Sequence, residues 1–230
     1  MSRLVVVTGG TKGIGAAIAA TFRAKGDQVL APGRAECDVT DEAAVAAYFA
    51  DAGPVDVLVN NAGISTSAPT ARTTLAEWHD QLDVNATGAF LCTRAVLPGM
   101  RERGSGRIIT VASTAGRAGY RYTSGYTASK HAAVGLMRAV AAEVVGTGVT
   151  ANAVCPAFVR TEMTARSVAR ISENTKLDTA GAEAALAAAA PLGRLLEPEE
   201  VAFAVAFLAA AEAAAINGQT LVLDGGGIQS

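Results

Sequence analysis

Short apolar runs rich in β-branched residues alternate with longer helical patterns from one end of the chain to the other. This alternation is typical of repeated strand, helix, strand units around a parallel sheet. The sequence therefore predicts an α/β fold, a three-layer Rossmann-like doubly wound parallel sheet with helices on both faces. The expected strands are Leu4–Thr8, Val29–Ala31, Val55–Val59, Arg107–Ala112, Thr150–Val154 and Gln219–Leu223. The expected helices are Gly13–Lys25, Asp41–Ala50 with Thr40 as its N-cap, one or two within Leu75–Arg103, Tyr126–Val145 and Glu197–Ala215.

The length of 230 residues suits one large α/β domain, so residues 1–230 are predicted to form a single domain. One segment departs from the alternation. Residues 161–190 are polar and then Ala-rich, with no strand signal. A long segment of this kind between regular elements is often an active-site lid, and ordinary surface helices explain it equally well.

Composition narrows the classes of partner. Half of the residues are hydrophobic and 17% are charged, which is typical of a compact globule with a large buried interior. A formal net charge of -2 offers no basic surface for nucleic acid or an anionic membrane, so neither is an expected partner. The most apolar stretch, Val201–Ile216, is shorter than the roughly 20 residues that span a bilayer.

Cysteine and histidine usage bears on disulfides, metal sites and catalytic triads. Cys37, Cys92 and Cys155 are far apart and lack the spacing of a disulfide framework or a zinc site, which favours reduced thiols and a cytoplasmic location. His79 and His131 are the only histidines in the chain. We therefore expect neither a metal site nor a Ser/His/Asp triad.

A glycine-rich turn follows the first expected strand and leads into the first expected helix. It reads Thr8-Gly9-Gly10-Thr11-Lys12-Gly13-Ile14-Gly15. Glycines permit a tight turn and let backbone N–H groups approach a pyrophosphate, whose charge the helix dipole stabilises. The turn therefore predicts dinucleotide binding, with a purely structural turn as the other interpretation.

Tyr126 and Lys130 are four residues apart in the long expected helix, which places both side chains on one helix face. A phenol with a pKa of about 10 is a poor acid or base at neutral pH, and a nearby ammonium lowers that pKa. Ser113 ends the preceding strand with a hydroxyl, at the sheet edge where ligands of such folds bind. These three side chains are candidates for one proton-transfer site.

Together these segments resemble the short-chain dehydrogenase/reductase family in its compact single-domain form. The resemblance runs from Val5 to Gly226 and includes Asn60-Asn61-Ala62-Gly63, Cys37-Asp38-Val39, Asp83-Val84-Asn85 and Asn152-Ala153-Val154-Cys155-Pro156-Ala157, where Ala157 replaces the usual Gly. It implies a catalytic set of Ser113, Tyr126, Lys130 and Asn85. In that set Ser113 donates a hydrogen bond to the substrate carbonyl oxygen, and Tyr126 protonates it. Lys130 holds the nicotinamide ribose and lowers the tyrosine pKa, while Asn85 orders a water relay to Lys130.

The same resemblance implies a set of cofactor contacts. They are Gly9, Thr11, Lys12, Gly13, Ile14, Gly15, Arg34, Asp38, Val39, Asn61, Ala62, Gly63, Tyr126, Lys130, Pro156, Val159 and Thr161. Gly33 stands where NAD-preferring relatives carry Asp, and Arg34 can pair with a 2′-phosphate. NADP(H) is therefore favoured. NAD(H) remains the alternative, because the chain between Arg34 and Asp38 is shorter than the family's usual helix and strand.

The resemblance implies an NADP(H)-dependent oxidoreductase that reduces a ketone to a secondary alcohol by hydride transfer. Ser113-Thr114-Ala115-Gly116 and the segment ending in Pro156 and Phe158 are similar to polyketide ketoreductases and 3-oxoacyl-thioester reductases. An NAD-dependent secondary-alcohol or 3-hydroxyacyl dehydrogenase is the alternative, and a non-catalytic NADP(H)-binding sensor is a third reading.

A small-molecule carbonyl or alcohol is the expected substrate. The loop Arg117–Gly125 is expected to line the pocket. Its side chains Arg117, Tyr120, Arg121 and Tyr122 can meet a polar or aromatic group there, and a solvated surface explains the two arginines equally well. The Ala-rich helices near Ala139–Val145 and Val201–Ile216 offer small apolar faces to further copies of the chain. Because the family's members are mostly tetramers, we expect a homotetramer.

Overall fold

The computed structural model describes residues 2–229, apart from the side chains at positions 174 and 189. Within that range six parallel strands form one sheet in the order β2-β1-β3-β4-β5-β6. The strands are β1 (Leu4–Val7), β2 (Gln28–Leu30), β3 (Val57–Asn60), β4 (Gly106–Val111), β5 (Val149–Pro156) and β6 (Thr220–Leu223). The predicted doubly wound α/β fold is confirmed.

Helices follow the strands along the chain. The α-helices are α1 (Gly13–Ala24), α2 (Glu42–Ala52), α3 (Leu75–Leu82), α4 (Gly88–Arg103), α5 (Ser124–Glu143), α6 (Glu162–Asn174), α7 (Thr179–Ala189) and α8 (Pro198–Leu208). Shorter helical turns are η1 (Thr70–Arg72), η2 (Asp83–Thr87), η3 (Thr114–Gly116) and η4 (Ala211–Ala215). No described helix is both long and apolar enough to cross a membrane.

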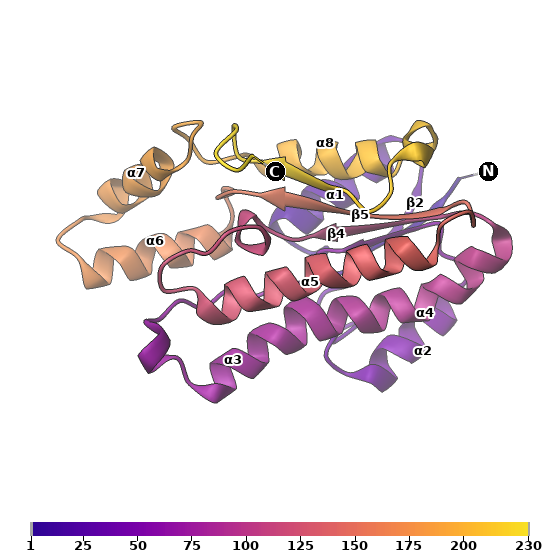
Figure 1. Ribbon diagram of the computed structural model, residues 1–230, viewed down its shortest axis with the longest axis horizontal. Helices are drawn as coiled ribbons and strands as arrows, with labels where there is room; N and C mark the ends of the chain where they lie inside the picture. Colours follow the sequence, from indigo (N-terminus) through magenta and orange to yellow (C-terminus); the bar gives the residue numbers. More distant parts are fainter. Residues whose placement is uncertain (1, 230) are drawn as a thin grey trace.

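Alternate strand residues point into two separate cores, because successive side chains of a strand lie on opposite faces of a sheet. In β1, Leu4 and Val6 pack into the core beneath α2, α4 and α5, whereas Val5 and Val7 pack into the core beneath α1 and α8. Figure 1 shows these two sets of helices on opposite sides of the sheet. The apolar runs of the four central strands, β1, β3, β4 and β5, reflect burial on both faces.

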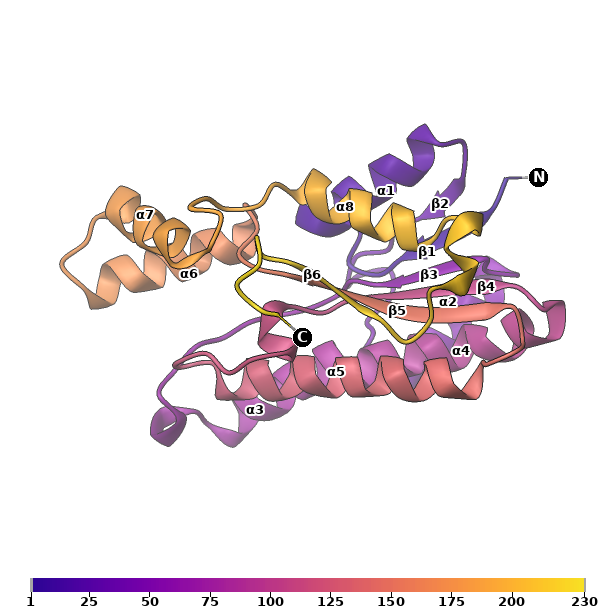
Figure 2. The same ribbon diagram turned by 45° about the horizontal axis from the view of Figure 1, so that its top comes forward.

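The strand order reverses at β1. The chain goes from β1 outward to β2 and then returns to form β3 on the other side of β1, with Val7 beside Val59. The loops after β1 and β3 therefore diverge, and such a switch point is where ligands bind in open α/β sheets. Helices α6 and α7 lie beyond the carboxyl ends of the strands, as Figures 1 and 2 show.

The predicted N-cap of α2 is wrong. Asp41, not Thr40, caps α2, because the Asp41 carboxylate accepts hydrogen bonds from Ala43 N and Ala44 N at 2.9 and 3.0 Å. Thr40 instead donates its hydroxyl to Asp38 Oδ1 at 2.7 Å. Both residue types are good N-caps, so the sequence alone did not distinguish them.

The last helix ends at Leu208, although the sequence predicted that it would continue to Ala215. The carbonyl oxygens of Ala209 and Ala210 accept hydrogen bonds from Arg3 and Arg107, at 2.6 and 3.4 Å. These long-range bonds hold the carbonyls at the helix end while the chain turns toward β6. An alanine run carries no local stop signal, so tertiary contacts decide where this helix ends.

Candidate active site

A cavity of about 1100 Å³ lies at the carboxyl edge of the sheet. Its wall includes residues that follow five successive strands in the sheet, namely Gly33, Gly9, Asn61, Ser113 and Ala157. A pocket for one drug-sized ligand holds roughly 300–1,000 Å³, so this volume suits a dinucleotide together with a substrate. All residues predicted to contact the cofactor line it, and so does Ser113.

The glycine-rich turn presents the start of α1 to this cavity. Lys12 is the N-cap residue and makes no side-chain cap, and the first turn of α1 carries no acidic residue. The first N–H groups of α1 are therefore without a capping side chain. A Cβ on Gly15 would lie 2.5 Å from Asn61 Nδ2, and one on Gly9 would lie 2.9 Å from Ala62 Cα. Side chains at these glycines would therefore collide with the loop after β3. The uncapped N-terminus of α1 lines the cavity, which suits the phosphates of a dinucleotide.

Charged groups gather at the adenosine end of the predicted cofactor site. Arg34 Nε pairs with Asp38 Oδ2 at 2.9 Å, and the Arg34 side chain is 83% exposed. Hydrogen bonds from Thr40 lower the pKa of Asp38, and Arg34 adds to that effect. Glu36, which no sequence pattern singled out, lies there too, and its Oε2 accepts a hydrogen bond from Gly33 N at 2.5 Å. Between β2 and Asp41 the chain forms turns and no helix or strand.

Lys12 is tied to the opposite wall of the cavity. Its ammonium pairs with Glu162 Oε2 at 2.8 Å, although both side chains are about two-thirds exposed. Glu162 is the first residue of α6, and Thr161, its N-cap, lies close to Gly13. The ion pair therefore connects the glycine-rich turn to the segment that was predicted as a lid. Nothing in the local sequence indicated this contact, which spans 150 positions.

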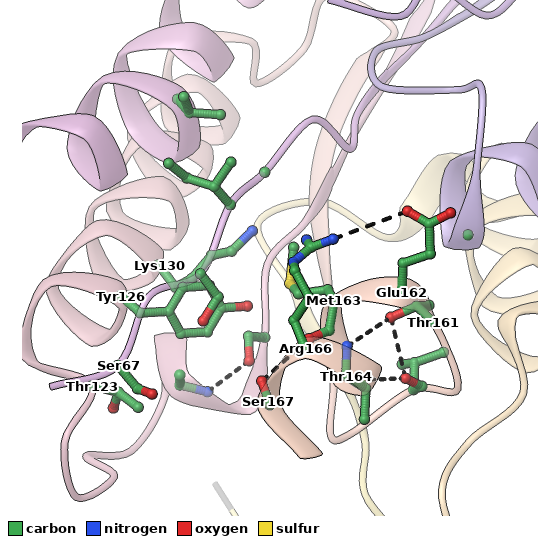
Figure 3. A pocket seen from close by; sticks show the side chains of 18 of the residues that line it. Ser67, Thr123, Tyr126, Lys130, Thr161, Glu162, Met163, Thr164, Arg166 and Ser167 are labelled. Carbon is green, nitrogen blue, oxygen red and sulfur yellow. Dashed lines mark hydrogen bonds and ion pairs between the residues drawn. The ribbon is translucent and has the colours of Figure 1, made fainter. Parts of the chain in front are cut away.

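Ser113, Tyr126 and Lys130 all line the cavity and come from two elements of the fold. Ser113 follows β4 and caps η3 by accepting a hydrogen bond from Ala115 N at 3.1 Å. Tyr126 and Lys130 lie in the first turns of α5, which begins at Ser124, two residues earlier than predicted. Figure 3 shows Tyr126 and Lys130 on one side of the cavity, with Met163, Arg166 and Ser167 of α6 on the other.

The pKa of Tyr126 shifts in the opposite direction from the one expected. Burial raises the pKa of Tyr126, and a hydrogen bond to Ser113 opposes that rise. Burial also lowers the pKa of Lys130 from 10.5 to about 8, because a charged ammonium is poorly solvated there. The predicted lowering of the tyrosine pKa by Lys130 is therefore wrong for the protein without a ligand.

Asn85 lies behind the cavity rather than in its wall. It belongs to η2, a single π-helical turn between α3 and α4. Its Oδ1 accepts from Ile64 N, and its Nδ2 donates to Ile64 O and to the Ser129 hydroxyl, each at 2.9 Å. It lines a small void of about 10 Å³ that Lys130 also lines, about the space of one water. Asn85 therefore connects the segment after β3 to α5.

Two further findings concern residues that the sequence left open. Ala157 keeps an ordinary backbone conformation, since Tyr122 alone has a positive φ among the described non-glycine residues. Arg72, Arg166 and Arg170 line the cavity but were not singled out from the sequence. The spacing of Arg166 and Arg170 was a usable signal, because residues four apart share one face of a helix.

Comparisons with known proteins identify the family of this chain. The family model described as enoyl-(acyl carrier protein) reductase matches residues 31–227. An acetoacetyl-CoA reductase of Rhizobium meliloti (strain 1021) is 38% identical, covering 98% of this chain and 98% of its own length. The 3-oxoacyl-(acyl-carrier-protein) reductase of Escherichia coli (strain K12) is 35% identical, over 97% of this chain and 96% of its own.

A solved structure is similar to this chain in both fold and sequence. The crystal structure of an actinorhodin polyketide ketoreductase variant with NADPH superposes with a TM-score of 0.90 at 36% identity, covering 98% of this chain and 97% of that chain. The chain therefore belongs to the short-chain dehydrogenase/reductase family, whose members are oxidoreductases that act on carbonyl and CH–OH groups with NAD(P).

Proposed function

We propose that this protein uses NADPH to reduce the ketone of a 3-oxoacyl thioester to a secondary alcohol, with Tyr126 as the proton donor. The observation that carries the proposal is the convergence of Ser113, Tyr126 and Lys130 on the cavity that also contains the glycine-rich turn. Relatives named as reductases of acetoacetyl-CoA and of 3-oxoacyl carrier-protein thioesters support the substrate class.

The chain's own residues supply orientation and the proton. NADPH, when bound, supplies the hydride that reaches the carbonyl carbon. Ser113 Oγ donates a hydrogen bond to the carbonyl oxygen, and Tyr126 Oη transfers its proton to the same oxygen as negative charge develops there. Hydrogen-bond donors in a site closed to water stabilise such charge more strongly than donors in bulk water.

The protonation states suit this division of work. The raised pKa of Tyr126 keeps the phenol protonated at neutral pH, which is the form that a proton donor needs. Lys130, with a pKa of about 8, exchanges protons near neutral pH and is suited to restoring the proton that Tyr126 gives up. Asn85 and Lys130 both line the small void behind the cavity.

We assign NADP(H) as the cofactor on the basic groups at the adenosine end. Arg34 presents an exposed guanidinium, and Lys12 presents an ammonium from the glycine-rich turn. A 2′-phosphate would be an additional anionic partner for either group. The NADPH bound by the actinorhodin ketoreductase variant supports the same assignment.

One observation favours the NAD-dependent alternative. The Glu36 carboxylate accepts from Gly33 N at the end of β2, where an acidic group hydrogen-bonds the ribose 2′-OH of NAD in many relatives of this fold. Thermal shifts separate the two alternatives, because a ligand that binds the native state alone stabilises it by RT ln(1 + [L]/Kd), which is larger for the tighter ligand at equal concentration. NADPH is expected to give the larger shift at equal concentration. A larger shift with NADH would overturn the choice.

We also propose a homotetramer. On α8, Phe203 is 74% exposed and Phe207 is 48% exposed, and four residues apart they form one apolar surface. Phe203→Glu is expected to lower the mass of the particle in solution, as measured by light scattering, whereas Leu75→Glu, at the exposed start of α3, is expected to leave it unchanged. An unchanged mass for both variants would remove α8 as an interface.

A substrate panel tests the function. Loss of NADPH absorbance is measured with acetoacetyl-CoA, with a simple ketone and with crotonyl-CoA, whose double bond probes the enoyl reductase activity named by the matching family model. Acetoacetyl-CoA is expected to react at least about 100-fold faster than either of the others, because thioester contacts away from the carbonyl contribute to transition-state binding. Faster reduction of crotonyl-CoA would replace the proposal with enoyl reduction.

A further inference from the structure

We infer that Gln81 is a positioning residue for Tyr126, because its buried amide holds the start of α5 and the cavity wall after β3 at a fixed separation. This inference rests on the proposed function, since it concerns where the proton donor lies relative to the substrate. Gln81 is near the end of α3, is 1% exposed and does not itself line the cavity. We call residues 64–68, most of which do line it, the wall segment.

The first turn of α5 is not fixed by a capping side chain. Among the residues that the structure describes, the N-cap residue Thr123 makes no side-chain capping bond, and its hydroxyl instead donates to the Tyr120 carbonyl at 2.9 Å. Tyr126 is the third residue of this helix. The first N–H groups of a helix have no partner within the helix, so an uncapped first turn is easily displaced. Contacts from other elements therefore decide where Tyr126 lies.

Gln81 makes such a contact one residue before Tyr126. A Cβ on Gly125 would lie 2.6 Å from Gln81 Nε2 and 3.7 Å from Trp78 Cα. Gly125 does not have a positive φ, so glycine is needed there for space and not for its backbone conformation. Figures 1 and 2 show α3 and α5 side by side, and the amide of Gln81 lies between them.

The same amide also holds the wall segment. Gln81 Oε1 accepts a hydrogen bond from Thr66 N at 3.1 Å, and Gln81 Nε2 donates to the Glu77 carbonyl at 3.2 Å. The second bond anchors the amide to its own helix. Because Gln81 is buried and both of its amide atoms are bonded, the amide cannot shift without losing its bond to Thr66. The positions of the wall segment and of the start of α5 are therefore linked.

The wall segment meets the start of α5 at a second point. Ala68 N donates to the Tyr122 carbonyl at 2.8 Å, and Ala68 forms a parallel β-bridge with Thr123. Figure 3 shows Ser67 and Thr123 on the same side of the cavity as Tyr126. A displacement of the wall segment would thus be transmitted to the turn that carries the proton donor.

Asn85, four residues after Gln81, makes an equivalent bridge. Its amide joins Ile64 of the wall segment to the Ser129 hydroxyl of α5. Ser129 follows Tyr126 along the helix, whereas the contact with Gln81 precedes it. Two buried amides therefore hold α5 on both sides of the proton donor.

Removing the amide tests the inference. Gln81→Met keeps the length of the side chain and removes its hydrogen bonds. The matched control is Asn217→Leu, because Asn217 accepts from Ala151 N at 2.9 Å and donates to the Ala141 carbonyl at 2.8 Å, which holds the other end of α5 to β5. Both variants lose two hydrogen bonds to a side-chain amide, and both are expected to be destabilised.

The readout is the rate constant of single-turnover NADPH oxidation by acetoacetyl-CoA, with the enzyme loaded with one equivalent of NADPH. An unfolded fraction lowers the amplitude of this reaction but not its rate constant. We expect the rate constant to fall at least about tenfold in Gln81→Met and to stay within about twofold of the wild type in Asn217→Leu, with the Kd for NADPH unchanged in both. A rate constant in Gln81→Met within about twofold of the wild type would overturn the inference.

A second comparison leaves Gln81 in place. Gly125→Ala is expected to lower the rate constant at least about tenfold in the wild type but less than about twofold in Gln81→Val, which lacks the atom that the new methyl group meets. Gly135→Ala, on the same helix with nothing within 4 Å, is expected to keep the wild-type rate constant. An equal loss from Gly125→Ala in both backgrounds would overturn the inference. So would a wild-type rate constant in Gly125→Ala alone, whether or not the Gln81 variants fold.

Failure of the proposed function gives a different result. A wild type that reduces a simple ketone but not acetoacetyl-CoA would refute the proposed substrate class. The same rate constants, measured with that ketone, would then decide the inference about Gln81, because Tyr126 is the proposed proton donor in either reaction.

Discussion

The Lys130 ammonium lies over the ring of Tyr126, 5.8 Å from the ring centroid, and donates a hydrogen bond to the Val111 carbonyl at 3.0 Å. The lysine therefore contacts the tyrosine through the face of its ring, while β4 supplies its acceptor. Burial shifts both groups toward their neutral forms. The pair is arranged so that a protonated phenol lies next to an amine that readily gains or loses a proton.

Replacing the buried lysine should stabilise the protein without ligand at neutral pH. The pKa of Lys130 falls from 10.5 in the unfolded chain to about 8 in the folded state, so the unfolded state binds more protons between these values. Burying the charged form therefore destabilises the wild type below about pH 8, and this penalty fades as the pH rises from 8 toward 10.5. We expect Lys130→Met to raise Tm by a few degrees at pH 7 and by less at pH 9. A Tm difference that is constant with pH would contradict the assigned shift.

Asn85→Ala should destabilise the fold as well as slow the reaction. The substitution removes three hydrogen bonds and leaves the Ile64 N–H and C=O without a side-chain partner. We expect a loss of about 2–3 kcal/mol in the free energy of unfolding, measured by urea denaturation. Gln219→Ala, which removes an exposed amide, should change it by less than about 0.5 kcal/mol. Equal stability of the two variants would show that Asn85 does not hold η2 and α5 together.

Gly63→Ala should disturb the catalytic centre by contact alone. A Cβ at this position would lie 3.1 Å from Asn85 Oδ1 and 3.5 Å from Lys130 Nζ. We expect turnover to fall at least about tenfold, because small displacements of catalytic groups are costly. Gly135→Ala in α5 meets nothing within 4 Å, and it should keep activity while adding about 0.5–1 kcal/mol of stability. Full activity in Gly63→Ala would mean that this side of Lys130 tolerates crowding.

Glu162→Gln should strengthen NADPH binding. The substitution removes the carboxylate that holds Lys12 at 2.8 Å and also removes a negative charge near the glycine-rich turn. Because the pair is exposed, its contribution is small, and we expect the Kd for NADPH to fall about two- to fivefold in a fluorescence titration. Glu183 lies on α7 and its carboxylate pairs with Arg160. Glu183→Gln removes that carboxylate and should leave the Kd for NADPH unchanged. Weaker binding in Glu162→Gln would show that the ion pair closes the site over the cofactor rather than competing with it.

Local patterns were sufficient to predict much of the fold. The four central strands, β1, β3, β4 and β5, are almost fully buried and therefore appear as apolar runs. The sequence locates all six strands to within two residues. The turn at Gly9 to Gly15 and the spacing of Tyr126 and Lys130 are also local, and the structure brings both to one cavity. Features encoded within one turn or one helix face could be predicted in this way.

Features that depend on long-range contacts could not be predicted from local patterns. The end of α8 is decided by Arg3 and Arg107, and the state of Lys12 is decided by Glu162 from the far wall of the cavity. The shifted pKa values of Tyr126 and Lys130 arise from burial, which a spacing of four residues does not reveal. These are consequences of how the elements pack.

The most direct test of the account is single-turnover reduction of acetoacetyl-CoA by enzyme loaded with NADPH, comparing wild type, Tyr126→Phe and Tyr48→Phe. Tyr48 lies on α2, outside the cavity wall, and loses the same hydroxyl. The account predicts that Tyr126→Phe binds NADPH normally but oxidises it about 100- to 10,000-fold more slowly, while Tyr48→Phe matches the wild type. Oxidation of NADPH by Tyr126→Phe at a rate near that of the wild type would contradict the assignment of Tyr126 as the proton donor.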